Sequence, residues 1–174
     1  FIDKFPLSTM AEGDIYITND PWKGTGHLHD IVVVTPTFKN KKLVALFACT
    51  THVVDIGGMG MAPDSKQIYH EGLFIPLMYF MKAGQLNETL LDFVHHNCRE
   101  SKQVEGDIYA LANCNDVGSR RLISMMQQYE LNDLDELAKT IINSTKSAMR
   151  MAISKLPTKK VFNQMAMDGY DEEI

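Results

Sequence analysis

The chain has 174 residues, a net charge of -5 and 45% hydrophobic residues, a composition that is ordinary for a globular domain and does not indicate disorder. The acidic balance, without a basic run, argues against a nucleic-acid or anionic-membrane surface, and no apolar run is long enough to span a bilayer. No signal peptide opens the chain and its three cysteines are widely spaced, so we expect a cytoplasmic protein without a disulfide framework.

The first predicted strand covers residues 15–18, where β-branched and aromatic side chains follow a turn at residues 12–14. Pro21 ends this strand and biases Asp20 toward extended backbone, so Asp20 lies in a loop that leads to His27. Two interpretations of Asp20 follow. It forms a wall of a site around His27, or its carboxylate caps the strand end in an Asx-turn.

A β-hairpin is predicted from two apolar runs, residues 31–38 and 43–49, which flank a polar turn. If the turn centres near Asn40-Lys41, the numbers of paired residues sum to about 81 or 82. The far ends of the two strands then meet, and each of these ends carries an H-x-x-D pair.

These pairs are His27 with Asp30, before the first strand, and His52 with Asp55, after the second. The register places Asp30 opposite Thr51 or His52, at a Cβ separation of roughly 4.5 to 5.5 Å. The set His27, Asp30 and His52 suits a divalent ion such as Zn²⁺, Mn²⁺ or Fe²⁺, with positions left open for water or substrate. The alternative is that all of them are solvated loop residues that bind no metal.

The second half of the chain is predicted to be helical. Asn87 is a suitable N-cap for one helix, and apolar residues recur at helical spacing over residues 108–129 and most strongly over 134–156. We interpret the last stripe as core or packing surface. Residues 161–167 have the pattern of a strand whose partner lies further along the chain.

The predicted fold class is α+β in a single domain over residues 1–174. An antiparallel β-rich part with the metal-site hairpin covers 1–83, a helical part covers 84–157, and a further β segment begins within 158–174. Because the chain starts at Phe1 without an initiator Met and stops just after the last predicted strand, we expect a fragment of a larger subunit.

Four segments of the chain resemble the hydantoinase B/oxoprolinase family. They are GDIYITNDPWKGTGHLHDIVVVTP (13–36), ACTTHVVDIGGMGMAPDS (48–65), EGLFIP (71–76) and VEGDIYALANCNDVGSRRL (104–122). Members of that family include the B subunits of ATP-dependent N-methylhydantoinases, the matching half of 5-oxoprolinase, and subunits of acetone and acetophenone carboxylases. The motifs here look most like the hydantoinase B branch, whose B subunits are several times longer than this chain.

The resemblance implies a divalent metal, Zn²⁺, Mn²⁺ or Fe²⁺, with its ligands at His27, Asp30 and His52. It also implies a hetero-oligomer with a hydantoinase A-like partner that uses ATP to phosphorylate the carbonyl compound. The family often has Pro or Asn where His29 stands, so His29 is not expected to be a ligand. An alternating strand would also turn His29 away from Asp30.

These inferences predict the metal-dependent part of an ATP-dependent cyclic amidase, a hydrolase that opens hydantoin, N-methylhydantoin or oxoproline rings. The ion would lower the pKa of bound water and polarise an oxygen of the activated ring. Asp55 is the expected catalytic carboxylate, which orients a histidine or acts as a base. Gly57 and Gly58 present backbone N–H groups to an oxyanion or phosphate, or simply end the strand. With Asp20 they are the candidate substrate-binding residues.

Two other functions remain open. An ATP-dependent ketone carboxylase of the acetone or acetophenone type would keep the metal and add CO₂ or bicarbonate, and bicarbonate-stimulated ATP use would favour it. A non-catalytic fragment whose helices dock onto a partner would be favoured if His27 and His52 lay far apart.

Overall fold

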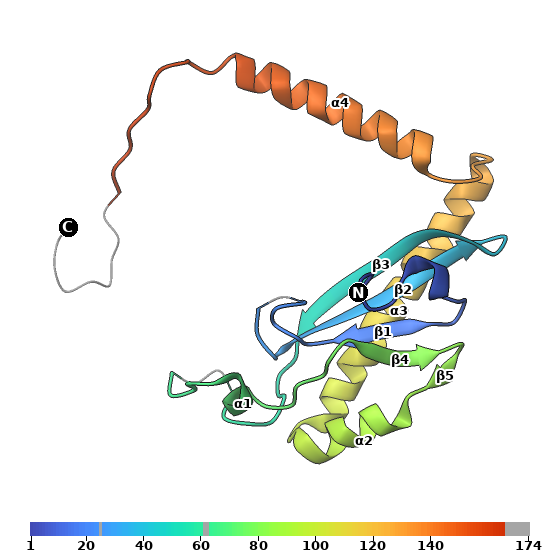
Figure 1. Cartoon of the computed structure of the whole chain (residues 1–174), viewed down its shortest axis with the longest axis vertical. Helices are drawn as coiled ribbons and strands as arrows, with labels where there is room; N and C mark the ends of the chain where they lie inside the picture. Colours follow the sequence, from blue (N-terminus) through green and yellow to red (C-terminus); the bar gives the residue numbers. More distant parts are fainter. Residues whose placement is uncertain (25, 61–62, 166–174) are drawn as a thin grey trace. The chain divides into compact units, whose positions relative to one another are not determined.

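The computed structural model describes residues 1–24, 26–60 and 63–165. The chain divides into two compact units, residues 1–133 and 134–174. The first unit carries a β-sheet and helices α1 to α3, and the second carries helix α4 (Figure 1). An antiparallel sheet with its helices grouped after the main strands confirms the predicted α+β class.

Within the described residues the sheet has five antiparallel strands in the order β3-β2-β1-β4-β5. The strands are β1 (Ile15–Thr18), β2 (Asp30–Lys39), β3 (Lys42–His52), β4 (Met78–Lys82) and β5 (Gln85–Leu86). The short β1 is central and pairs with both β2 and β4. The two long strands form the predicted hairpin at one side of the sheet.

The register of this hairpin is set by its turn and by one bulge. Asn40 and Lys41 have φ of 51° and 64°, the left-handed pair that a two-residue hairpin turn requires. Next to the turn the paired numbers sum to 81, but beyond Val44 they sum to 82, because Val44 has no partner in β2. The extra residue therefore brings Asp30 opposite His52 rather than Thr51.

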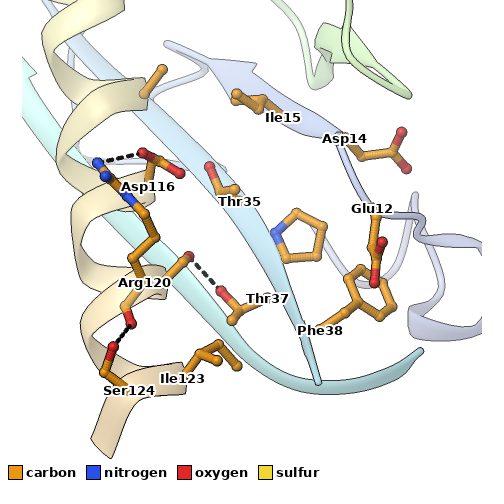
Figure 2. Close-up of a pocket in the computed structure, with 14 residues that line it drawn as sticks. Glu12, Asp14, Ile15, Thr35, Thr37, Phe38, Asp116, Arg120, Ile123 and Ser124 are labelled. Atoms are coloured by element: carbon orange, nitrogen blue, oxygen red, sulfur yellow. Dashed lines mark hydrogen bonds and ion pairs between the residues drawn. The ribbon is translucent and has the colours of Figure 1, made fainter. Parts of the chain in front are cut away.

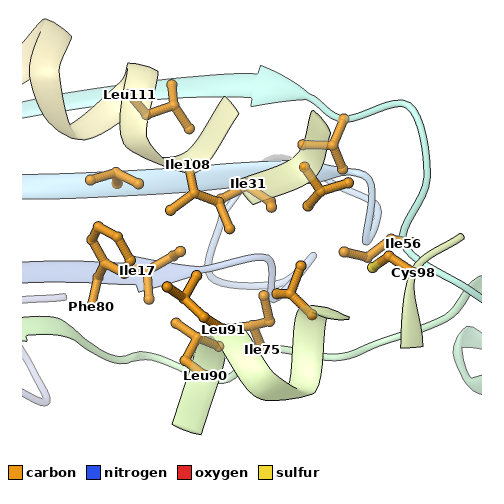
Figure 3. Packing of buried hydrophobic residues seen from close by; sticks show 14 of the residues in the cluster. Ile17, Ile31, Ile56, Ile75, Phe80, Leu90, Leu91, Cys98, Ile108 and Leu111 are labelled. Carbon is orange, nitrogen blue, oxygen red and sulfur yellow. The ribbon is translucent and has the colours of Figure 1, made fainter. Parts of the chain in front are cut away.

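Helices α2 (Glu88–Asn97) and α3 (Ser101–Gln128) pack against one face of the sheet. The predicted cap is confirmed, since the Asn87 side chain accepts a hydrogen bond from the Leu90 N–H. Figure 3 shows the core between sheet and helices, whose buried side chains include Ile17, Ile31, Val33, Ile56, Phe80, Leu91, Val94 and Ile108. The β-rich and helical parts expected to divide at residue 83 thus share one core.

Helix α4 (Asp135–Ser154) has no buried residue, so the apolar stripe expected to pack is exposed, Ile141 and Met149 included. After it, residues 158–165 of the expected β segment form no strand, and residues 166–174 lie outside the described residues. Among the residues described, no helix is both long enough and apolar enough to cross a membrane.

Two loops beside the hairpin contact each other through their backbones. The Met59 N–H donates to the His70 carbonyl and the Leu73 N–H donates to the Ile56 carbonyl, both at 2.7 Å. Helix α1 (Ile68–Glu71) lies within the second loop. Gly72 has φ of 134°, and a Cβ there would overlap the Ile56 carbonyl oxygen. The close approach of these loops therefore depends on glycine.

We expect Gly72→Ala to lower the free energy of unfolding by about 2 kcal/mol, because alanine is strained at this φ and collides with backbone. Gly106→Ala is the control, since a Cβ at this position in α3 meets nothing within 4 Å and should stabilise the helix by up to about 1 kcal/mol. Urea unfolding of both variants measures the difference. An equal change in the free energy of unfolding for the two variants would contradict the close approach of Gly72 to the Ile56 carbonyl.

Candidate metal centre

The three predicted ligands converge at the open end of the β2–β3 hairpin. Asp30 begins β2 and pairs across the sheet with His52, which ends β3. Each oxygen of the Asp30 carboxylate faces one histidine: Oδ1 lies 3.0 Å from His52 Nδ1, and Oδ2 lies 3.3 Å from His27 Nε2. The His27 and His52 ring centroids are 4.9 Å apart. The wide separation that would have favoured a non-catalytic fragment is therefore not found.

The chemistry of this cluster fits a divalent ion. One ligand atom from each of His27, Asp30 and His52 lies within 4.8 Å of the other two. An ion about 2.1 Å from each donor needs them no more than about 4.2 Å apart, so donors within 4.8 Å of one another are close to the spacing that an ion requires. Two imidazole nitrogens and a carboxylate oxygen form a donor set used for Zn²⁺, Mn²⁺ or Fe²⁺.

Two polar side chains, the buried Asn19 and the partly buried Glu71, fix the loop that carries His27. The Asn19 amide donates to the carbonyls of Leu28 and Leu73, at 2.7 and 2.9 Å, and accepts from the Ile75 N–H. The Glu71 carboxylate accepts from the Leu28 N–H at 3.0 Å. Both side chains therefore hold the backbone of Leu28, the neighbour of His27. Sequence reasoning missed Asn19, because its partners lie up to 56 residues away.

His29 lies in the cluster, so the expectation that it turns away was wrong. His29 precedes β2, so the alternation of a strand does not govern it. Its buried ring stacks on that of His52, with centroids 5.2 Å apart and planes at 14°. Burial lowers the pKa of His29, and the neighbouring His52 and His27 lower it further. Nδ1 of His27 and of His29 is buried without a hydrogen-bond partner among the described residues.

Asp55 lies in the turn after β3, and its carboxylate faces the start of α3 rather than a histidine. It accepts hydrogen bonds from the backbone N–H groups of Gly57, Arg99 and Glu100, and from the Arg99 guanidinium at 2.6 Å. Burial by itself would raise the pKa of Asp55, but these donors outweigh it and hold the pKa below its usual range. The described contacts thus give Asp55 an anchoring role, different from the expected orientation of a histidine.

The three candidate substrate-binding residues also have local contacts. Asp20 forms the Asx-turn considered from the sequence: its Oδ1 accepts from the Trp22 N–H at 2.9 Å, and its carbonyl accepts from Gly24. The Gly57 N–H donates to Asp55, and the Gly58 carbonyl accepts from Arg99. The Gly57 N–H is therefore already engaged within the protein, and the contact of any of the three with a substrate stays a prediction.

A recess adjoins the metal cluster. It has a volume of about 350 Å³ and is lined by Pro21, Trp22, Gly26, Ile68 and Glu71. Gly26 precedes His27, and Glu71 holds Leu28, so the recess and the cluster share one loop. The Trp22 side chain is 76% exposed, which leaves a large aromatic surface open at this recess.

A larger cavity lies elsewhere, between α3 and the strands β1 and β2. It measures about 550 Å³, and Figure 2 shows two pairs among its polar side chains. Arg120 forms an ion pair with Asp116 at 2.8 Å, and Thr37 contacts Ser119 through hydroxyls 2.5 Å apart. None of its lining residues belongs to the loop that carries His27, whereas Pro21, Trp22 and Gly26 of the recess do, so its size alone does not make it the reactive site.

Comparisons with known proteins agree with the motifs. A sequence model described as hydantoinase B/oxoprolinase matches residues 1–174. The beta subunit of caprolactamase from Pseudomonas jessenii is 32% identical over 151 residues, covering 85% of this chain and 26% of that protein. The B subunit of a putative D-/L-hydantoinase from Pseudomonas sp. strain NS671 is 29% identical over 166 residues, covering 93% and 28%. The chain therefore spans about a quarter of the length of these curated relatives.

Two solved structures share the fold. The crystal structure of ATP-dependent caprolactamase from Pseudomonas jessenii has a TM-score of 0.80 and 30% identity, covering 90% of this chain and 27% of that chain. Nucleotide-free acetone carboxylase has a TM-score of 0.64 at 20% identity, covering 78% and 18%. The second likeness shows the fold alone.

We expect Asp55→Asn to lower the free energy of unfolding by about 2 kcal/mol at pH 7, because charge-assisted hydrogen bonds are lost. A carboxylate with a lowered folded-state pKa stabilises the protein above its unfolded pKa, near 3.9, and loses this contribution as the pH falls through the folded value. The difference from wild type should therefore shrink below about pH 4. Urea unfolding at pH 7 and pH 3 measures it.

The exposed Asp92 in α2 provides the control, since Asp92→Asn should change stability little at either pH. A deficit of Asp55→Asn that stayed constant from pH 7 to pH 3 would contradict the anchoring role.

Proposed function

Because this chain belongs to the hydantoinase B/oxoprolinase family, we propose that it forms the metal-dependent part of an ATP-dependent amidase that opens a small cyclic amide. The observation that carries the proposal is the convergence of His27, Asp30 and His52 on one point. The matched relatives named as a caprolactamase and a hydantoinase support the substrate class, since both names refer to rings that contain an amide.

His27, Asp30 and His52 would hold the ion, and Zn²⁺, Mn²⁺ and Fe²⁺ are the candidates. A bound divalent ion supplies a Lewis acid for an amide oxygen or for water. The chain itself positions the ligands: Asp30 fixes both imidazoles through its two oxygens, and Asn19 and Glu71 fix the backbone next to His27.

The substrate ring lies in the recess beside Trp22, where the exposed indole offers an apolar face to a small ring. Asp20 contributes by holding the turn that carries Trp22. Gly58 contributes by permitting the loop contact that places Glu71, and Gly57 by permitting a close approach to the Asn97 carbonyl at the end of α2. Asp55 acts as a positioning residue for the turn that follows β3. Its engaged oxygens and lowered pKa make it a poor base at neutral pH.

ATP is used by a partner, and a hydantoinase A-like protein is the partner that we propose. The relatives are named as a beta subunit and a B subunit, which supports a hetero-oligomer, and the caprolactamase with the same fold is described as ATP-dependent. Ring opening by hydrolysis is favoured over ketone carboxylation, because the caprolactamase shares more of its sequence with this chain than acetone carboxylase does.

Metal content is the first test. We expect the purified full chain to hold about one divalent ion per chain and His52→Ala to lose most of it, since two ligands rarely retain an ion that three bind. His95→Ala is the matched control, because His95 pairs with Glu105 through contacts outside the cluster. Elemental analysis gives the readout. No stoichiometric metal in the wild type, or equal metal in wild type and His52→Ala, would end the metal assignment.

Ring opening is the second test, with the full chain, its ATP-using partner and caprolactam, hydantoin or 5-oxoproline. We expect ATP-dependent release of the linear product, and Trp22→Ala should raise KM about fivefold while kcat changes less, because the indole contributes to binding. Phe93→Ala, at an exposed aromatic residue of α2, should leave KM unchanged. ATP use that rises with bicarbonate and an added ketone, without ring opening, would favour the carboxylase instead.

A further inference from the structure

His29 has an environment that neither its sequence position nor the metal assignment explains. Only 5% of the residue is exposed, although its side chain carries two polar nitrogens. Its backbone carbonyl accepts from the Val53 N–H at 2.8 Å, a single hydrogen bond beyond the last paired residues of β2 and β3. The ring is therefore held at the hairpin end by backbone that is itself fixed.

The orientation of the ring argues against a role as a metal ligand. An imidazole coordinates through a lone pair that lies in its ring plane, so an ion bound by His52 lies in the plane of that ring. The His29 ring is stacked on the His52 ring at 14°, so its lone pairs lie in a plane nearly parallel to that of His52, an arrangement that does not favour convergence of both rings on one ion. His27 differs in this respect, because its plane crosses that of His52 at 65°.

The same stacking restricts His52, which needs support. His52 ends an edge strand and its side chain is 52% exposed. Apart from His29, the described contacts of its ring are the hydrogen bond to Asp30 and the tilted ring of His27. That bond fixes the position of Nδ1 but leaves the ring free to tilt about it. A flat buried surface against one face of the ring removes this freedom.

We propose that His29 is the positioning residue of the metal centre: its buried ring holds the His52 ring in the orientation that binds the ion, and it does so by stacking rather than by coordination. This inference rests on the proposed metal site. It predicts that a flat ring without nitrogen at position 29 should orient the His52 ring as well as imidazole does. No hydrogen bond at His29 Nδ1 is lost in that exchange, since Nδ1 has no partner among the described residues.

Two substitutions in the full chain separate stacking from coordination. His29→Phe keeps a flat ring and removes both nitrogens, whereas His29→Leu removes the flat ring. Co²⁺ is added to metal-free protein and binding is followed by visible absorption. We expect the dissociation constant of Co²⁺ to stay within about threefold of wild type for His29→Phe and to rise about tenfold for His29→Leu. A tenfold loss is the smaller of the effects expected when a group that orients a metal ligand is removed. His95→Leu controls for loss of an imidazole elsewhere.

A second readout does not depend on metal. In metal-free full chain labelled with ¹³C-histidine, the His52 ring signals should stay sharp in His29→Phe and broaden or shift toward averaged values in His29→Leu. Weakening by both substitutions to the same degree would show that a nitrogen is needed and overturn the inference, as would unchanged binding in both. If wild-type protein binds no Co²⁺, the proposed metal-dependent function is contradicted. The His52 signals then still show whether His29 orients the His52 ring.

Discussion

The candidate site depends on one cross-strand pair, Asp30 with His52. A two-residue turn closes the hairpin, and the unpaired Val44 then shifts the register so that these two residues face each other. A change of one residue in the pairing would move the side chains of a whole strand to the other face of the sheet. The pairing is secured by the core, because Ile31 and Val33 of β2 are buried against α2 and α3, while Asp30 and His52 lie at the edge of that packing.

The rest of the site is organised around this pair by polar groups that are buried or partly buried. Asn19 and Glu71 hold the loop that brings His27 to Asp30. Asp55 connects the turn after His52 to Arg99 at the start of α3. Each of these carboxylate or amide groups satisfies backbone N–H or carbonyl groups that would be costly to bury unpaired. Asp30 and His52 stand at strand ends and His27 on the preceding loop.

Sequence reasoning predicted what depends on local patterns. The apolar runs and the polar turn predicted the hairpin, and Asn87 predicted the start of α2. The sum of 81 or 82 left Asp30 opposite Thr51 or His52, because a bulge at Val44 depends on packing that spacing does not reveal. The contacts of Asp55 and His29 were not predictable for a related reason. The partners of Asp55 lie 44 and 45 residues away in Arg99 and Glu100, and His29 stands just outside the strand whose alternation was applied to it.

The most direct test is anomalous diffraction from crystals of the full chain loaded with Mn²⁺ or Co²⁺, with data collected at the absorption edge of the metal. The account predicts a single strong peak about 2.0 to 2.3 Å from a nitrogen of His27, a carboxylate oxygen of Asp30 and a nitrogen of His52. A peak bound by other residues, with Asp30 and His52 still paired and empty, would contradict it.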